Sequence, residues 1–479
     1  MLKGLLFSET EQLMERLGEK PGRAEVLSGW LYHDSRRLVR DIAEIAGGGD
    51  EHRAECGNNR AAQAKNRMGR KTREALGLVA TADGGLELEE VQRAADGTRK
   101  LVSVLTSGEG AGKKVETVII PMLRGPQRDP RYTVCVSSQV GCAMNCQFCY
   151  TGRLGLMANL QTAQIVEQVL VAKRFLESVG DPAPVTGVVF MGMGEPFDNY
   201  ERVMRAVKVL TDPRAGVRLK ASSVTVSTVG LVPQIEQFCK DAGNGASLAL
   251  SLHAVTDEIR DKLIPVNRRY PLAQLSETLR THFPRILKPK PKSFSAESSQ
   301  PSPAAAASHN EAAATLAAAA GKGEKRVKVA EQQLSPTSDD ARRELKPTNL
   351  DEKGRPRRRG RRKARILAVE YTLLGGVNDS VEDADRLADW LREVACVVNL
   401  ITFNAHEGTP FSSSSLPASE AFRQALTARG QLCTFRDSRG DDGMAACGQL
   451  GGESMSGSED RGRKPVPVAW EPPSTAQAA

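Results

Sequence analysis

The stretch Cys142-Ala-Met-Asn-Cys146-Gln-Phe-Cys149 places three cysteines within eight residues, in the spacing CxxxCxxC. It follows the apolar run Thr133–Ser137, which we expect to be a buried strand. Thiolates are soft ligands that suit zinc or iron–sulfur clusters. A structural zinc site normally has four protein ligands, and no second CxxC pair or histidine doublet accompanies these three cysteines. The stretch therefore favours a 4Fe–4S cluster with three cysteine ligands, in which one iron stays open to a small molecule.

Working outward from this stretch, short β-rich runs alternate with helical periods from about residue 131. The expected strands are Thr133–Ser137, Gly187–Met191, Ser223–Thr228, Ser247–Leu252, Ile366–Leu373 and Val397–Phe403. The expected helices are Thr162–Leu176, Tyr200–Leu210, Val232–Lys240 and Val381–Val394. This alternation predicts parallel strands joined by crossover helices. Six such units predict an α/β fold built on an incomplete (β/α)6 barrel, with the cysteine stretch at the carboxyl end of its first strand, where barrels hold their active sites.

The rest of the chain is expected to divide by composition around this core. We predict a small N-terminal helical domain at 1–45, a linker or extension at 46–97, a β-rich lead-in at 98–130, the first part of the core at 131–283, a low-complexity basic insertion at 284–365, the second part of the core at 366–452 and a tail at 453–479. In the lead-in, Leu101–Leu105 and Val115–Ile120 are predicted to be paired strands. The insertion and the tail lack the β-branched and aromatic residues of a core, so we expect both to be disordered.

Composition excludes several classes of protein. With nine cysteines in 479 residues, cysteine is too dilute for a disulfide-stapled scaffold. No apolar run approaches the roughly 18–20 residues of a membrane span. The first residues lack the basic and apolar regions of a secretory signal, and Ser8-Glu-Thr-Glu11 reads as a capping box that opens a helix. We therefore expect a reducing, cytoplasmic setting, or an organelle such as a plastid if the source is eukaryotic.

The net charge of +8 is concentrated in one segment. Between Gly321 and Arg365 there are 16 Lys+Arg and seven Asp+Glu, a surplus of nine, so the remaining chain carries a net charge of −1. Such a run is either a solvated linker or a phosphate-binding tether, since clustered basic residues gain affinity for RNA through counterion release. By random-coil scaling, an 80-residue chain spans on the order of 50 Å, enough to reach a phosphate-rich partner around the barrel.

Several motifs beyond the cysteine stretch carry a family resemblance. They are Cys135-Val-Ser-Ser-Gln-Val-Gly-Cys142, Gly192-Met-Gly-Glu195-Pro, Ser227-Thr-Val-Gly230, Leu250-Ser-Leu-His253-Ala, Asn399-Leu-Ile-Thr-Phe-Asn404 and Arg439-Gly-Asp-Asp-Gly-Met-Ala-Ala-Cys447-Gly-Gln. Together they resemble the RlmN/Cfr-type RNA adenine methyltransferases of the radical S-adenosylmethionine (SAM) superfamily. The N-terminal helices, including Leu17-Gly-Glu-Lys-Pro21, resemble the small helical RNA-binding-like domain of that family.

The resemblance implies an activity and its cofactors. The family methylates carbon 2 of adenine in ribosomal RNA, and possibly in tRNA, with a 4Fe–4S cluster whose open iron binds SAM. A methyl group is first placed on a cysteine, and a 5′-deoxyadenosyl radical then activates that S-methyl carbon for addition to the base. The resemblance also implies an electron donor such as flavodoxin or ferredoxin, a monomer and no membrane partner.

The same resemblance assigns roles to residues. By it, Cys447 carries the methyl group, Cys135 resolves the covalent adduct by forming a disulfide, and Glu116 is the proton acceptor. Ligands of the cluster are Cys142, Cys146 and Cys149. Contacts to SAM are Gly194, Glu195, Ser227, Ser251, Leu252, His253 and Asn404. Two other functions stay open: methylation of carbon 8 of adenine, as in the Cfr branch, and an RNA-binding homologue without catalysis.

Overall fold

In the computed structural model, residues 1–33, 39–45, 68–122, 130–214, 216–241, 245–285, 366–406, 408–436 and 439–451 are described. The chain divides into two compact units, Met1–Ile286 with Ala364–Ala479, and Leu287–Lys363. The second unit lies outside the described residues, and so do the expected tail and most of the insertion predicted at 284–365. The fold below is that of the first unit.

Ten strands form one mixed sheet. Their bounds are β1 Leu86–Arg93, β2 Arg99–Leu105, β3 Lys114–Pro121, β4 Tyr132–Cys135, β7 Val185–Phe190, β8 Val224–Thr228, β9 Ser247–Ser251, β10 Leu367–Leu373, β11 Cys396–Thr402 and β12 Cys433–Arg436. In the sheet they follow one another in this order. Pairing is antiparallel from β1 to β4 and parallel from β4 to β12. A separate two-stranded sheet pairs β5 (Gln139–Gly141) with β6 (Leu156–Asn159).

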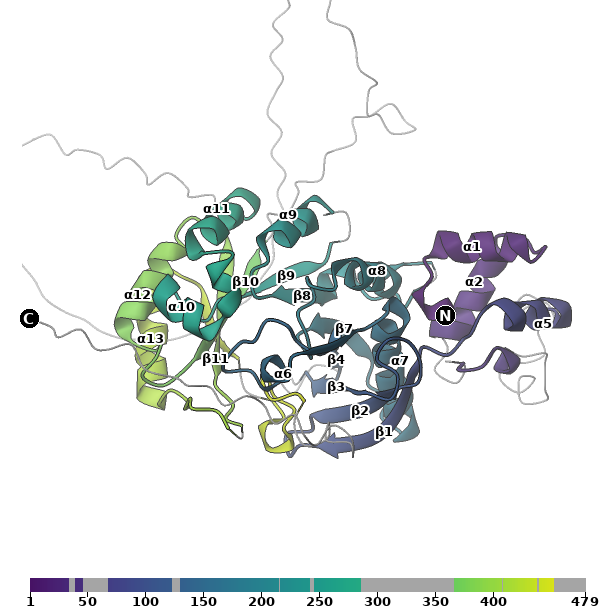
Figure 1. Cartoon of the computed structure of the whole chain (residues 1–479), viewed down its shortest axis with the longest axis horizontal. Coiled ribbons are helices and arrows are strands. Elements are labelled where there is room, and N and C mark those ends of the chain that lie inside the picture. The colour runs from purple at the N-terminus through teal and green to yellow at the C-terminus, as the bar shows by residue number, and fades with distance from the viewer. Residues whose placement is uncertain are drawn as a thin grey trace, which may run out of the picture. The chain divides into compact units, whose positions relative to one another are not determined.

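Helices connect the parallel strands. Their bounds are α6 Tyr150–Arg153, α7 Thr162–Ser178, α8 Tyr200–Thr211, α9 Val232–Lys240, α10 Asp257–Leu263, α11 Leu272–His282, α12 Val381–Trp390 and α13 Leu416–Ala428. Figure 1 shows the larger ones following one another along the outer side of the parallel strands. This is the strand–helix alternation expected of a partial (β/α) barrel. All six expected strands are present, and the short β12 adds a seventh parallel strand that the sequence did not indicate.

The two faces of the parallel strands differ in composition. Residues that face the helices are apolar and fully buried, for example Val188, Val226 and Val369. Residues on the opposite face are smaller or polar, such as Thr225 and Asn399, and they line an internal cavity. Because strand side chains alternate between faces, one run of residues builds the core on one side and the wall of the cavity on the other.

The segment 46–97, expected to be a linker or extension, contains regular structure in its described part. Helix α5 spans Arg70–Val79, and β1 pairs with the whole of β2 in an antiparallel hairpin. The sequence of β1, LELEEVQR, is rich in glutamate and thus poor in the residues favoured in strands. Pairing with β2 overrides that local preference, so the lead-in is three strands rather than the two expected.

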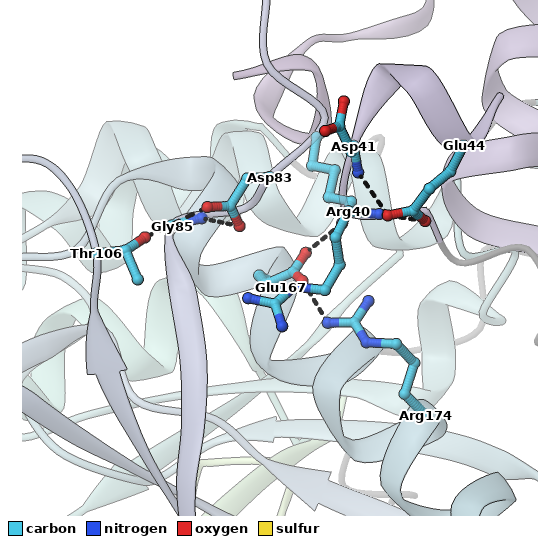
Figure 2. Close-up of polar contacts among 9 residues, drawn as sticks. Arg40, Asp41, Glu44, Asp83, Gly85, Thr106, Glu167 and Arg174 are labelled. Atoms are coloured by element: carbon cyan, nitrogen blue, oxygen red, sulfur yellow. Dashed lines mark hydrogen bonds and ion pairs between the residues drawn. The ribbon is translucent and has the colours of Figure 1, made fainter.

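The N-terminal helices α1 (Phe7–Arg16) and α2 (Arg23–Ser28) precede this lead-in. Helix α1 begins one residue before Ser8, and the carboxylate of Glu9 accepts the N–H of Leu6 at 2.8 Å, so the capping box expected at Ser8–Glu11 is wrong. Figure 2 shows Glu167 of α7 among its polar contacts, including the one with Arg174. Glu167 pairs with the ammonium of Lys3 at 2.7 Å and with Arg174 at 2.5 Å.

The residues that flank the insertion lie at the amino ends of the parallel strands. Pro284 bridges to Val394, and Arg285 donates its N–H to Glu393 at 2.8 Å, just before β11. Pro284 and Arg285, expected to belong to the insertion, are thus ordered against the core. Among the described residues, no helix is long and apolar enough to cross a membrane.

Candidate active site

Two adjoining cavities lie inside the sheet, toward the carboxyl ends of the parallel strands. The smaller one, about 130 Å³, opens onto the cysteine stretch and the loops after β7, β8 and β9. The larger one, about 680 Å³, extends along the inner face of the strands. Six residues line both: Met191, Glu370, Ile401, Arg436, Cys447 and Leu450. Cys447 therefore stands at the junction of the two cavities.

The three cysteines of the CxxxCxxC stretch lie in one loop between β5 and α6. Cys142 and Cys146 are buried, and Cys146 and Cys149 line the smaller cavity. Burial raises the pKa of all three thiols, and at Cys146 the neighbouring Cys142 and Cys149 raise it further, so the three sulfurs share one environment. Iron ligation would supply the positive charge that favours their thiolates.

This donor set fits an iron–sulfur cluster. Three soft sulfur donors lie on one loop beside a cavity that has space for a further ligand. Among the described residues, no three His, Cys, Asp or Glu side chains converge on a single metal ion. A polynuclear cluster holds its sulfur ligands farther apart than a single ion does.

Glu195 is the charged group of the smaller cavity beside the cysteines. Its carboxylate accepts the N–H of Phe197 and the N–H of Val229, each at 3.0 Å. Burial raises its pKa to about 7, against the lowering effect of these hydrogen bonds. A carboxylate held in this way is suited to receive an ammonium group.

Gly194 gives the backbone the shape that this loop requires. Its φ is +97°, and a Cβ atom at this position would lie 2.5 Å from the Cβ of Gln139. Gln139 in turn accepts the N–H of Glu195 at 2.8 Å. Only glycine combines this φ with such a close approach, so Gly194 sets the position of Glu195.

Ser227, Ser251 and His253 complete the polar wall of the smaller cavity. The hydroxyls of Ser227 and Ser251 lie 3.3 Å apart. The ring of His253 accepts the N–H of Thr372 on Nδ1 at 3.0 Å, and burial lowers its pKa to about 3. His253 is therefore neutral at physiological pH, with Nε2–H available as a donor.

Two of the expected SAM contacts lie elsewhere. The side chain of Leu252 is fully buried in the core and lines neither cavity, and its N–H bonds the carbonyl of Glu370. Asn404 lines the larger cavity, and its amide donates to the carbonyl of Cys447 at 3.4 Å. The structure thus brings Gly194, Glu195, Ser227, Ser251 and His253 together, while Asn404 reaches the loop of Cys447.

Cys135 and Cys447 come together from opposite ends of the core. Both line the larger cavity, and both are free thiols. Burial raises the pKa of Cys135 to about 12, and Cys447 adds to that rise. Burial also raises the pKa of Cys447, although its side chain is exposed to the cavity. The guanidinium of Arg436 opposes both shifts, because a nearby cation favours each thiolate.

Glu116, expected to be the proton acceptor, is fully buried and lines neither cavity. Its carboxylate lies 3.6 Å from the ammonium of Lys100 and accepts the N–H of Gly451 at 2.9 Å. In this arrangement Glu116 contacts the loop that carries Cys447.

Sequence reasoning missed three charged residues of the site. Arg436 pairs with Glu370 at 3.6 Å beside both thiols. Arg260, fully buried, donates to the carbonyls of Leu252 at 3.0 Å and Val229 at 2.6 Å and so fixes the loops after β8 and β9. Arg436 follows the only run of strand-like residues between α13 and the Cys447 motif, which was its one available signal.

Comparisons with known proteins show the family of the chain. Residues 136–282 match the Radical SAM superfamily. Two relatives, each a "Dual-specificity RNA methyltransferase RlmN", come from Anaeromyxobacter sp. and Geobacter sulfurreducens. The first is 34% identical, covering 97% of this chain and 93% of its own; the second is 33% identical, covering 94% and 92%. A crystal structure of a radical SAM methyltransferase from Sphaerobacter thermophilus superimposes with a TM-score of 0.65 at 30% identity, covering 93% of this chain and 98% of that one.

The partial barrel, its cysteine stretch and these matches define a radical SAM enzyme, a class that uses a 4Fe–4S cluster and SAM. Within that class, the chain belongs to the family of RlmN dual-specificity RNA methyltransferases. It is accordingly a SAM-dependent methyltransferase, as the motifs indicated.

Proposed function

We propose that this enzyme methylates carbon 2 of adenine in ribosomal RNA, and also in tRNA, through an S-methyl group carried by Cys447. The observation that carries the proposal is the meeting of Cys447 and Cys135 in one cavity next to the cysteine loop. Simple displacement by SAM fails at carbon 2, which is neither acidic nor nucleophilic. Two thiols at the site provide the covalent route that such a carbon needs. The names of the relatives support RNA as the substrate.

In this proposal the cluster is held by Cys142, Cys146 and Cys149, which leaves its fourth iron to SAM. When bound, the cluster and SAM supply the radical that activates the S-methyl carbon. The carboxylate of Glu195 receives the ammonium of SAM, while the serines and His253 line the same cavity. Leu252 is assigned a contact with SAM through its backbone only. Asn404 is assigned to the side of the bound SAM that faces the loop of Cys447.

The two thiols have successive tasks. Cys447 loses its proton to solvent, its thiolate would take the methyl group from SAM with release of S-adenosylhomocysteine, and Arg436 favours that thiolate. Once the carbon is joined to the base, the adduct would give up its carbon-2 proton and its unpaired electron, the latter to the one-electron carrier. The thiolate of Cys135 then attacks the sulfur of Cys447, and the electron pair of the bond from that sulfur to the carbon passes to the carbon, which takes up a proton. A disulfide forms and the methylated base is released.

The proton of carbon 2 is assigned to Glu116. Because Glu116 now contacts Gly451 beneath the loop, this role requires the loop to shift before the proton is transferred. We further propose that the enzyme acts as a monomer and receives electrons from a small carrier such as flavodoxin or ferredoxin.

The Cfr-like alternative, methylation of carbon 8, uses the same motifs. Mass spectrometry of digested RNA from cells that lack the enzyme separates the two reactions. We expect 2-methyladenosine to disappear from ribosomal RNA and tRNA and to return with the wild-type gene. Loss of 8-methyladenosine with 2-methyladenosine intact would sink the carbon-2 assignment.

The role of Cys135 is tested by Cys135→Ala. Without the resolving thiol, the adduct between Cys447 and RNA persists, so a crosslink that depends on Cys447 should accumulate. Turnover should fall by about 10²-fold or more, as when one covalent participant is removed. The readout is a gel shift that resists denaturation, with Cys433→Ala on β12 as the control for a thiol outside both cavities. Clean turnover by Cys135→Ala would refute the assignment.

The catalytically inactive alternative predicts a different protein. The proposed enzyme, reconstituted anaerobically with iron and sulfide, should absorb broadly in the visible range and consume SAM. A colourless protein that binds RNA and never cleaves SAM would instead be a scaffold.

A further inference from the structure

The loop Arg439–Gly451, which we call the Cys447 loop, is docked on the β1–β2 hairpin and on β3. From these contacts we propose that Lys100 is a positioning residue. It holds the Cys447 loop in the docked position, beside the thiol of Cys135. The inference rests on the proposed function, because that function makes Cys447 the carrier of the methyl group. Neither the family motifs nor the comparisons assign a role to Lys100 or to the hairpin.

Lys100 and Glu116 form hydrogen bonds with the backbone of the loop on both sides of Cys447. The ammonium of Lys100 donates to the carbonyl of Met444 at 3.0 Å, three residues before Cys447. Glu116 accepts the N–H of Gly451 at 2.9 Å, four residues after it. Lys100 and Glu116 themselves pair at 3.6 Å, with side chains 1% and 0% exposed. One buried ion pair therefore holds both ends of the segment that bears the thiol.

The turn of the β1–β2 hairpin makes further contacts with the Cys447 loop. The carboxylate of Asp442 accepts the N–H of Ala95 at 2.9 Å, and the carboxylate of Asp96 accepts the N–H of Gly440 at 3.2 Å. Arg439 pairs with Asp96 at 3.9 Å. These contacts position the start of the Cys447 loop, whereas Lys100 acts closer to the thiol.

The backbone at Met444 is held in an unfavourable conformation by contacts within the loop and by one contact from Lys100. Met444 has φ +48° and ψ +35°, a left-handed conformation that is costly for a residue with a side chain. Such a conformation persists only where the surroundings determine it. The hydrogen bond from Lys100 to the carbonyl of Met444 is one such determinant.

Because Lys100 and Glu116 are buried, their hydrogen bonds with the loop favour its docked position over a lifted one. If the loop lifts, the ammonium of Lys100 loses the Met444 carbonyl and the carboxylate of Glu116 loses the Gly451 N–H. Both groups would then be poorly satisfied charges in a buried place, which is unfavourable. Lys100 thus favours the loop position in which Cys447 and Cys135 line the same cavity.

The test is amide hydrogen exchange of the full-length enzyme, followed in peptides from 439–451. In Lys100→Met we expect exchange in this loop to rise by about tenfold, with core peptides from β7 unchanged. Lys100→Arg retains charge and donor and should restore protection. Because Lys100→Met removes the cation beside the buried Glu116 and risks misfolding, the double variant Lys100→Met/Glu116→Gln is measured as well. The amide that Glu116→Gln introduces still accepts the N–H of Gly451, so the double variant isolates the loss of Lys100.

The matched control is Lys114→Met. Lys114 pairs with Glu89 at 2.7 Å on the same three-stranded lead-in and, in the part of the chain that the structure describes, contacts no residue of the Cys447 loop. Its loop exchange should equal that of the wild type. Unchanged loop exchange in both Lys100→Met and the double variant would overturn the proposal.

Kinetics then separate positioning from general stability. Lys100→Met should lower kcat by about tenfold and raise the KM for SAM by less than that. The Cys447 loop lines one side of the smaller cavity, whereas Glu195, Ser227 and His253 lie on other elements. Lys100→Arg should recover kcat. Peptide mass spectrometry measures the fraction of Cys447 that carries a methyl group. This measurement separates a failure of the proposed function from a failure of the role proposed for Lys100. Wild-type protein that never carries this methyl contradicts the proposed function, while the exchange experiment still decides the role of Lys100.

Discussion

Glu195 is a single residue in which burial and hydrogen bonding act against each other. Burial raises its pKa to about 7, while the N–H groups of Val229 and Phe197 favour its charged form. Beside the two thiols, burial raises the pKa of Cys135 and of Cys447, and the positive charge of Arg436 lowers both by favouring the thiolates. At the residue scale, the site is therefore tuned by a few buried charges, and their protonation states govern what the cavity binds.

This tuning predicts a pH dependence of SAM binding. The ammonium of SAM binds the carboxylate of Glu195, so affinity is complete above a pH of about 7 and is lost as the pH falls through it. The KM for SAM should rise by about tenfold per pH unit on the acid side. Glu195→Gln should raise the KM at every pH and flatten the profile. Asp385→Asn, at a surface ion pair, should keep the wild-type profile; a flat wild-type profile would contradict the assigned role.

At the scale of elements, buried ion pairs join segments that are distant along the chain. Lys100 and Glu116 join the lead-in strands to the Cys447 loop. Lys3 and Glu167, both 0% exposed, join the N-terminal segment to α7, as Figure 2 shows for Glu167. Each pair fixes the position of one element on another, because neither charge is tolerated in the interior without its partner.

The Lys3–Glu167 pair leads to a stability prediction. Glu167→Gln leaves the ammonium of Lys3 buried beside a neutral group and should cost about 3–5 kcal/mol in the free energy of unfolding. The double variant Lys3→Met/Glu167→Gln should recover part of that loss, because the fully buried charge of Lys3 is gone and only the partly exposed Arg174 has lost its carboxylate partner. Denaturant unfolding measures both. The exposed pair Arg70–Glu74 provides the control, since Glu74→Gln should change stability by less than about 0.5 kcal/mol. Equal losses at the two sites would show that burial does not set the cost.

At the scale of the whole molecule, charge and catalysis are separated. The surplus of Lys and Arg lies within Gly321–Arg365, whereas the rest of the chain carries a net charge of −1. The residues that flank the insertion lie at the amino ends of the parallel strands, and the cavities open toward the carboxyl ends. We expect a basic segment of this kind to bind RNA phosphates through counterion release.

Deletion of residues 288–363 tests this separation. The shortened enzyme should fold and cleave SAM like the full chain, because the deleted residues belong to the other compact unit. Its affinity for RNA should fall, and the slope of log K against log salt concentration should become shallower, since fewer phosphates are neutralised. A filter-binding titration at several salt concentrations measures both. Unchanged affinity together with an unchanged slope would rule the tether out.

Local pattern was enough to predict much of this protein. The spacing of Cys142, Cys146 and Cys149, the six parallel strands and the helices α7, α8 and α9 were all indicated by the sequence. Strand alternation, helical periodicity and motif spacing are properties of neighbouring residues, so they are readable before folding. The loop glycine Gly194 and the carboxylate Glu195 also belong to one contiguous motif.

What only the tertiary structure decided were the relations between distant residues. Lys100 is buried because β1, β3 and the Cys447 loop lie around it. The glutamate-rich β1 is a strand because β2 pairs with it. Arg436 stands beside Cys135 and Cys447 because β12 closes the row of parallel strands. The cost of burying a charge depends on the partner that folding brings to it, and that partner lies far away in the sequence.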